Sequence, residues 1–278
     1  MDRAKTIEAS LERRFGETIP VEADGLDIDP LARIAGRATH RRYRDQPVSP
    51  ALLRLLCACA LSAPSKSDLQ QRDIVIVRDA AKRGEIAALI PDMPWIGAAP
   101  AFLIFCANGR RLPAIAKLRG KPFPNDHFDL LFNAVGDAAI ALATFICAAE
   151  AAGLGCCAIS VIRDHAAHVS GLIGLPPRVI PFAGLCVGWP AEEARVVPRL
   201  PLAATVHVDR YEEGDLPAQL STYDERREKL RPYATQRGPE RWGKPARYGW
   251  SEDKARQYAD PQRADFGAFV RAQGFSLD

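Results

Sequence analysis

The sequence predicts an α+β fold in which helices flank a central mixed β-sheet. Three segments, 101–107, 155–162 and 179–187, are almost entirely apolar, as expected for strands whose two faces are both covered by helices. The segment 126–152 carries apolar residues at helical spacing around nearly its whole circumference. With 47% hydrophobic residues among 278, the chain has ample apolar surface for a packed core.

The chain is expected to begin with a helical extension over residues 1–36, whose default role is packing or dimer contact. Two short helices are expected there, at 6–15 and 29–35. Ser49 and Pro50 then mark a helix start, because serine caps free amide groups and proline is tolerated in the first turn. This helix should end at Pro64. The next expected elements are a strand at 73–77 and a helix at 80–90.

The long apolar helix should begin at Asp126 and be followed by a buried strand at 155–162. Glu150 and the glycines at 153 and 155 divide this apolar region into halves too short to cross a bilayer. The formal net charge of +3 is nearly neutral, so neither nucleic acid nor a membrane is expected as a partner. The charged N-terminus shows no secretory signal.

The part of the chain after this region is expected to hold a helix at 165–173, a strand at 179–187 and a charged, proline-rich arm over 208–278. A terminal helix near 264–273 closes the arm. The seven cysteines lie within apolar runs without metal-ligand spacing, so we expect reduced core thiols in the cytoplasm and no metal site. The adjacent Cys156 and Cys157 should point to opposite faces of one strand.

Two segments at the ends of the helix that follows Ser49 carry phosphate-binding chemistry. Arg37 and Arg41 suit a phosphate, because guanidinium groups form forked, charge-assisted hydrogen bonds. Hydroxyl groups lie close by in sequence at Thr39, Ser65 and Ser67. For either segment alone, a solvated basic run or a plain turn is the simpler interpretation. Since one helix joins the two segments, both are able to contribute to one ligand site.

These segments resemble the first two sequence blocks of the nitroreductase family of FMN-binding flavoproteins, Arg-x-Ser/Thr-x-Arg-x-Phe/Tyr and Pro-Ser-x-x-x-x-Gln. The matching residues are Arg37, Thr39, Arg41 and Tyr43, then Pro64, Ser65 and Gln70. Two later segments, 184–190 and 198–201, are similar to the subgroup of NADPH-dependent flavin reductases and oxygen-insensitive nitroreductases. The four blocks occur in family order.

The resemblance implies a nitroreductase-like fold with an FMN-binding core over 37–207 and a C-terminal arm over 208–278. It also implies an obligate homodimer with two FMN sites at the subunit interface, at whose centre the long helix lies. The residues that it places around FMN are Arg37, Thr39, Arg41 and Arg199 at the phosphate, Ser65, Ser67 and Gln70 along the ribityl chain or ring edge, and the backbone of Ser160 and Val161 near flavin N5. Ser65 as a turn cap and Gln70 as the start of a strand are the simpler alternatives.

The chain departs from the family pattern at four positions. Ala38 stands where a second basic residue is common, and Val197 replaces a lysine of the Lys-Pro-Arg block. Met93 and Asp68 stand where the family has a Gln and an Asn. Substrate range is therefore less firmly implied than fold and flavin.

The function implied is electron transfer from NADPH through FMN to a nitroaromatic, a quinone or a free flavin, with ping-pong kinetics. No side chain is expected to act as a catalytic nucleophile, since the flavin carries the redox chemistry. Arg237 and Arg241 in the basic arm are candidates for the 2′-phosphate of NADPH. Alternatives are a reductive dehalogenase or flavin-cleaving enzyme of the same fold, and a non-catalytic FMN-binding sensor or carrier.

Overall fold

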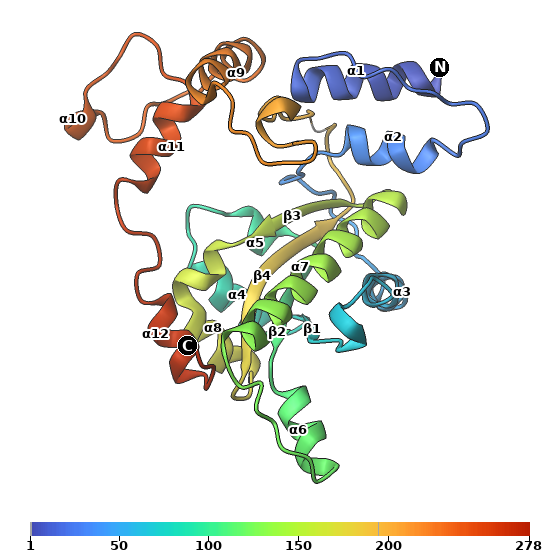
Figure 1. The fold of residues 1–278 in the computed structure, drawn as a ribbon, viewed down its shortest axis with the longest axis vertical. Helices are drawn as coiled ribbons and strands as arrows, with labels where there is room; N and C mark the ends of the chain where they lie inside the picture. Colours follow the sequence, from blue (N-terminus) through green and yellow to red (C-terminus); the bar gives the residue numbers. More distant parts are fainter. Residues whose placement is uncertain (1, 194) are drawn as a thin grey trace. The chain divides into compact units, whose positions relative to one another are not determined.

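The computed structural model describes residues 2–193 and 195–278. The chain divides into two compact units (Figure 1). The arm unit contains Met1–Ala38 and Arg195–Gln262, and the sheet unit contains Thr39–Ala194 and Arg263–Asp278.

The sheet unit is built on four antiparallel strands in the order β1-β2-β4-β3. Their bounds are β1 (Arg72–Ile76), β2 (Ala101–Asn108), β3 (Gly155–Ile159) and β4 (Val179–Gly188). The expected α+β class is confirmed, but the described strands form no mixed sheet. A continuous apolar run indicates that both faces of a strand are buried, but it does not distinguish parallel from antiparallel pairing.

Helices cover both faces of this sheet (Figure 1). One face packs on α3 (Pro50–Leu61) and α7 (Phe128–Ala151), and the other on α4 (Ala80–Ala88), α5 (Trp95–Ala98) and α8 (Ala166–Ile173). Cys156 joins the first layer and Cys157 the second, which confirms that they point to opposite faces. The remaining elements of this unit are η1 (Lys66–Asp68), α6 (Arg111–Leu118), η2 (Val161–His165) and α12 (Phe266–Ala272).

The long helix α7 begins later than expected. Its N-cap is His127, whose side chain accepts a hydrogen bond from the Asp129 amide, whereas both Asp126 carboxylate oxygens pair with Arg178, at 2.7 and 2.5 Å. By length and composition α7 is able to cross a membrane, but nine of its residues are buried against the sheet and α3, as in a core helix. The next strand ends at Ile159 and not at 162, because the chain turns into η2.

The arm unit consists of helices and connecting segments. Its elements are α1 (Arg3–Phe15), α2 (Asp29–Gly36), η3 (Leu202–Ala204), α9 (Leu216–Leu230), α10 (Pro239–Trp242) and α11 (Trp250–Tyr258). Helices α9 and α11 replace the extended arm expected after residue 208. Their sequences are mostly polar, so no apolar periodicity marks them. The last residues belong to the sheet unit, where Val270 and Phe275 are buried beside Ala107 and Ile180.

Candidate functional site

In the sheet unit, the first and third sequence blocks lie side by side. Tyr43 forms an antiparallel bridge with Pro190, and the Arg44 amide donates to the Trp189 carbonyl at 2.8 Å. Gly188 makes this approach possible, since a Cβ there would lie 2.5 Å from Pro100 Cδ and 2.8 Å from Tyr43 Cδ1. Close packing therefore explains why residue 188 of the third block is a glycine.

Tyr43 fixes the segment that carries two of the predicted phosphate ligands. Its hydroxyl donates to the His40 carbonyl at 2.7 Å, and burial raises the pKa of this phenol far above its usual range. Thr39 is half-buried, and Arg41 is exposed with its guanidinium carbon 5.3 Å from the centre of the Trp95 ring. Arg41 thus has a stacking partner that leaves its hydrogen-bond donors available.

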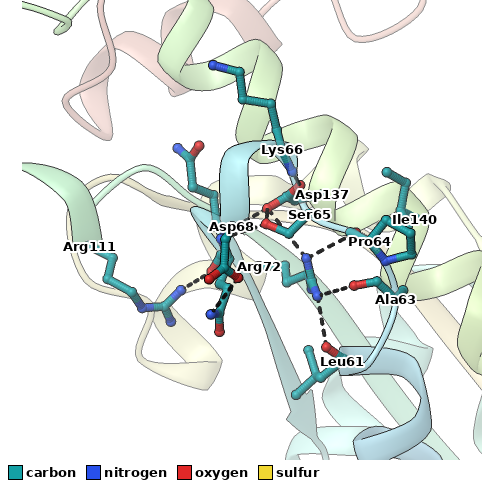
Figure 2. Close-up of polar contacts among 12 residues, drawn as sticks. Leu61, Ala63, Pro64, Ser65, Lys66, Asp68, Arg72, Arg111, Asp137 and Ile140 are labelled. Atoms are coloured by element: carbon teal, nitrogen blue, oxygen red, sulfur yellow. Dashed lines mark hydrogen bonds and ion pairs between the residues drawn. The ribbon is translucent and has the colours of Figure 1, made fainter.

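The Ser65 loop, residues 64–70, is anchored by the carboxylate of Asp137 on α7 (Figure 2). Asp137 is 1% exposed. It accepts hydrogen bonds from Ser65 Oγ at 2.9 Å, from the Lys66 amide at 3.1 Å and from the Gln71 amide at 2.8 Å. One buried carboxylate therefore satisfies three donors of the loop and its continuation.

The guanidinium of Arg72 completes this anchor. Its Nη1 lies 3.6 Å from Asp137 Oδ2, and its Nη2 donates to the carbonyls of Leu61 and Ala63 at 2.9 and 2.8 Å (Figure 2). Both members of the ion pair are buried, so each compensates the desolvated charge of the other. The end of α3 and the Ser65 loop are thereby tied to α7.

The anchor holds the loop in an unusual backbone conformation. Ser67, Asp68 and Gln70 have φ angles of 48°, 57° and 52°, in the left-handed region that non-glycine residues rarely adopt. Such residues persist where surrounding contacts determine them, and they cluster at binding sites. The Ser65 hydroxyl also accepts from the Gln70 amide at 2.7 Å, whereas the side chains of Ser67 and Gln70 are exposed.

The backbone predicted to approach the flavin lies at the end of the edge strand β3. Ser160 is exposed and occupies the N-cap position of η2 without a side-chain capping hydrogen bond, and Val161 is the first residue of η2. The structure thus places Thr39, Arg41, Ser65 and Ser160 in one unit.

Arg37 and Arg199 belong to the arm unit, where they line one pocket of about 620 Å³. Aromatic side chains of Phe15, Tyr223 and Trp250 form part of its wall. Two guanidinium groups at one pocket fit a doubly charged phosphate, because each provides several donors in a planar fork. The structure therefore brings together two of the four predicted phosphate ligands.

The two arginines predicted to bind NADPH each have a carboxylate partner. Arg237 Nε lies 3.6 Å from Oδ1 of the buried Asp253, and Arg241 Nη1 donates to Asp260 Oδ1 at 2.7 Å. The second pair joins two exposed side chains, so it is weak and exchangeable. Arg226, another basic residue of the arm, lies on α9 and donates to the Arg199 carbonyl.

Asp137, Arg72 and Arg14 are buried charged residues that the sequence analysis did not single out. Asp137 has a visible signal, because it is the carboxylate in the middle of a long apolar helix, between Asp129 and Glu150 near the helix ends, and must therefore find buried partners. Arg14 and Arg72 follow other polar residues in the sequence, and no pattern separates them from solvated side chains.

Comparison with known proteins identifies relatives along most of the chain. Residues 34–189 match the model of the nitroreductase family, and residues 198–278 match that of the nitroreductase family C-terminal domain. An FMN reductase [NAD(P)H] of Bacillus subtilis is 33% identical over 242 residues, covering 86% of this chain and 94% of the relative. An oxygen-insensitive NADPH nitroreductase of Salmonella typhimurium is 31% identical over 246 residues, covering 87% and 96%.

Solved structures agree with this assignment. NfrA2 of B. megaterium superposes with a TM-score of 0.80 at 31% identity, covering 90% of this chain and 98% of that one. The NADPH:FMN oxidoreductase from Vibrio harveyi, complexed with NAD⁺, gives a TM-score of 0.75 at 26% identity, covering 88% and 97%. The ordered sequence blocks, the fold and both family matches lead to one conclusion: this chain belongs to the nitroreductase family.

Proposed function

We propose that this protein is an FMN-dependent oxidoreductase that transfers electrons from NAD(P)H to nitroaromatics, quinones or flavins. One observation carries the proposal: Arg37 and Arg199, from two separate sequence blocks, line one pocket in a chain whose relatives are NAD(P)H-dependent FMN reductases and nitroreductases. FMN, when bound, supplies the two-electron chemistry that ordinary side chains lack.

The residues present fit this cofactor. Arg37 and Arg199 would hold the phosphate at the pocket that they line, and their charges would offset those of the phosphate. Thr39 and Arg41 remain candidate phosphate ligands on the sequence resemblance. The Ser65 loop offers an exposed Ser67 and Gln70 in a backbone fixed by Asp137, which suits contacts along the ribityl chain or ring edge. The backbone of Ser160 and Val161 would lie at the ring.

We place the 2′-phosphate of NADPH at Arg237 and Arg241 of the arm unit. Arg241 supports this best, because its pairing with the exposed Asp260 is easily exchanged for a phosphate. With reduced thiols at all seven free cysteines, we place the enzyme in the cytoplasm.

We also propose that the protein is an obligate homodimer. Apolar or small residues follow one exposed line along α7 at helical spacing: Phe128, Phe132, Gly136, Ile140, Ala143 and Cys147. Phe132 is 64% exposed and Ile140 40%, so this stripe remains open within one chain. A second copy would cover it, and exposed stripes of this kind mark interaction surfaces.

Steady-state rates with NADPH and a series of acceptors test the proposed activity. Because one flavin must receive electrons before it can deliver them, the double-reciprocal lines should be parallel. Intersecting lines would contradict the ping-pong scheme. A protein that binds FMN but consumes no NADPH with any acceptor would be a sensor or carrier, and the proposed activity would be wrong.

A further inference from the structure

Arg14 lies in the last turn of α1, before the residue at which the family match begins. Its side chain is 8% exposed. The guanidinium donates through Nη2 to the carbonyls of Ala35 and Arg37, at 3.0 and 2.7 Å, and through Nη1 to the Val197 carbonyl at 3.4 Å. One buried side chain therefore joins the end of α2 to the segment that precedes Arg199.

The backbone of Arg14 makes a second connection to the same segment. Its carbonyl accepts a hydrogen bond from the Arg199 amide at 2.7 Å. Arg14 is thus bonded directly to the main chain of both Arg37 and Arg199. All three arginines line the pocket of about 620 Å³ in the arm unit.

Other contacts hold the segment around Arg199 but do not reach Arg37. The Tyr223 hydroxyl donates to the Pro198 carbonyl at 3.2 Å, and Glu17 accepts from the Leu202 amide at 3.3 Å. Arginine suits the bridging position because its planar guanidinium presents several donors at fixed angles, whereas all the donors of a lysine ammonium lie on one nitrogen atom.

We infer that Arg14 is a positioning residue for the phosphate of FMN. It fixes the two backbone segments from which Arg37 and Arg199 project, so that both guanidinium groups meet the same phosphate. The inference rests on the proposed FMN site, and it gives the N-terminal helix a function in cofactor binding.

The test compares two flavins on the full chain freed of cofactor. Riboflavin lacks the phosphate, so a residue that acts through the phosphate ligands affects FMN alone. Arg14→Met should raise the Kd of FMN roughly tenfold or more and leave that of riboflavin within about twofold. Arg13→Met, at the exposed neighbour on the same helix, should change neither.

Arg14→Lys is the second variant, in case the methionine variant does not fold. It keeps a cation at the pocket but loses the bridge, so the same selective loss of FMN is expected. An unchanged Kd for FMN, or an equal loss for both flavins, would overturn the inference, since equal loss reports general structural damage. If the wild-type chain takes up no FMN, the proposed cofactor site fails together with this inference. If the wild type and Arg14→Lys bind FMN equally, only the role of Arg14 fails.

Discussion

A single carboxylate, that of Asp137, determines the conformation of the Ser65 loop. Asp137→Ala would leave the Ser65 hydroxyl, two backbone amides and the Arg72 guanidinium without their partner. Breaking a buried ion pair in this way costs about 3–5 kcal/mol. We therefore expect the free energy of unfolding, measured by urea denaturation, to fall by about that amount.

Asp129→Ala is the matched control, because Asp129 is exposed on the same helix. It should change the free energy of unfolding by less than about 1 kcal/mol. If the two variants unfold at the same urea concentration, Asp137 does not anchor the loop.

A second prediction at this scale concerns the choice of nucleotide. In the proposed site, Arg241 pairs with the 2′-phosphate that NADPH carries and NADH lacks. Arg241→Gln should therefore lower the ratio of kcat/KM for NADPH to that for NADH roughly tenfold. Arg247→Gln, which removes another exposed arginine with a carboxylate partner, is the control. An unchanged ratio in the Arg241 variant would remove this residue from the nucleotide site.

At the scale of elements, β2 is buried along its whole length, and this affects the thiol of Cys106. Burial, with a smaller contribution from the Asp73 charge, raises the pKa of Cys106 from 9.0 to about 12. Above pH 9 the unfolded chain loses this proton while the folded chain keeps it, so the free energy of unfolding falls as pH rises from 9 toward 12. Below pH 9 the contribution is fully present.

Cys106→Ala should therefore reduce the alkaline slope of stability, measured by urea unfolding from about pH 8 to about pH 10.5. It should not abolish the slope, because burial also raises the pKa of Cys186 and Tyr43. Cys59→Ala, at an exposed position, is the control. A slope that is equal in wild type and Cys106→Ala would contradict the assignment.

The elements that could be predicted from sequence are those with strong apolar patterns. The strands β2 and β4 were recognisable because their residues are buried against both helical layers, and α7 because its apolar residues pack on one face of the sheet. Helix α9 was not recognisable, since Tyr223 is its only buried residue and its mostly polar sequence shows no helical periodicity of apolar residues. The relative direction of the strands could not be predicted either, because strand pairing depends on contacts between segments that are distant in the sequence.

At the scale of the whole molecule, the exposed stripe of α7 predicts self-association. Phe132→Glu should weaken the dimer roughly a hundredfold, because a twofold axis places the introduced charge in the interface twice. Sedimentation velocity over a range of concentrations measures this. Leu26→Glu, at a similarly exposed residue of the other unit, should leave the association unchanged. A wild-type protein that is monomeric and still holds FMN would contradict the proposed dimer.

The sequence named candidate ligands of the site, but it did not name the residues that hold their backbone segments in place. Arg37, Arg199 and Ser65 belong to short sequence blocks that match the nitroreductase family pattern. Arg14, Arg72 and Asp137 act by bonding backbone groups of other segments, and those partners become visible only in three dimensions. Candidate ligands can therefore be proposed from motifs, whereas the residues that fix their backbone segments are found only in the structure.

An anaerobic titration of the purified protein with NADPH tests the central claim most directly. We expect a yellow protein whose visible flavin band bleaches on addition of NADPH and returns when a nitroaromatic or quinone is added. A protein that neither retains nor takes up FMN, or whose flavin band is unchanged by NADPH, would contradict it.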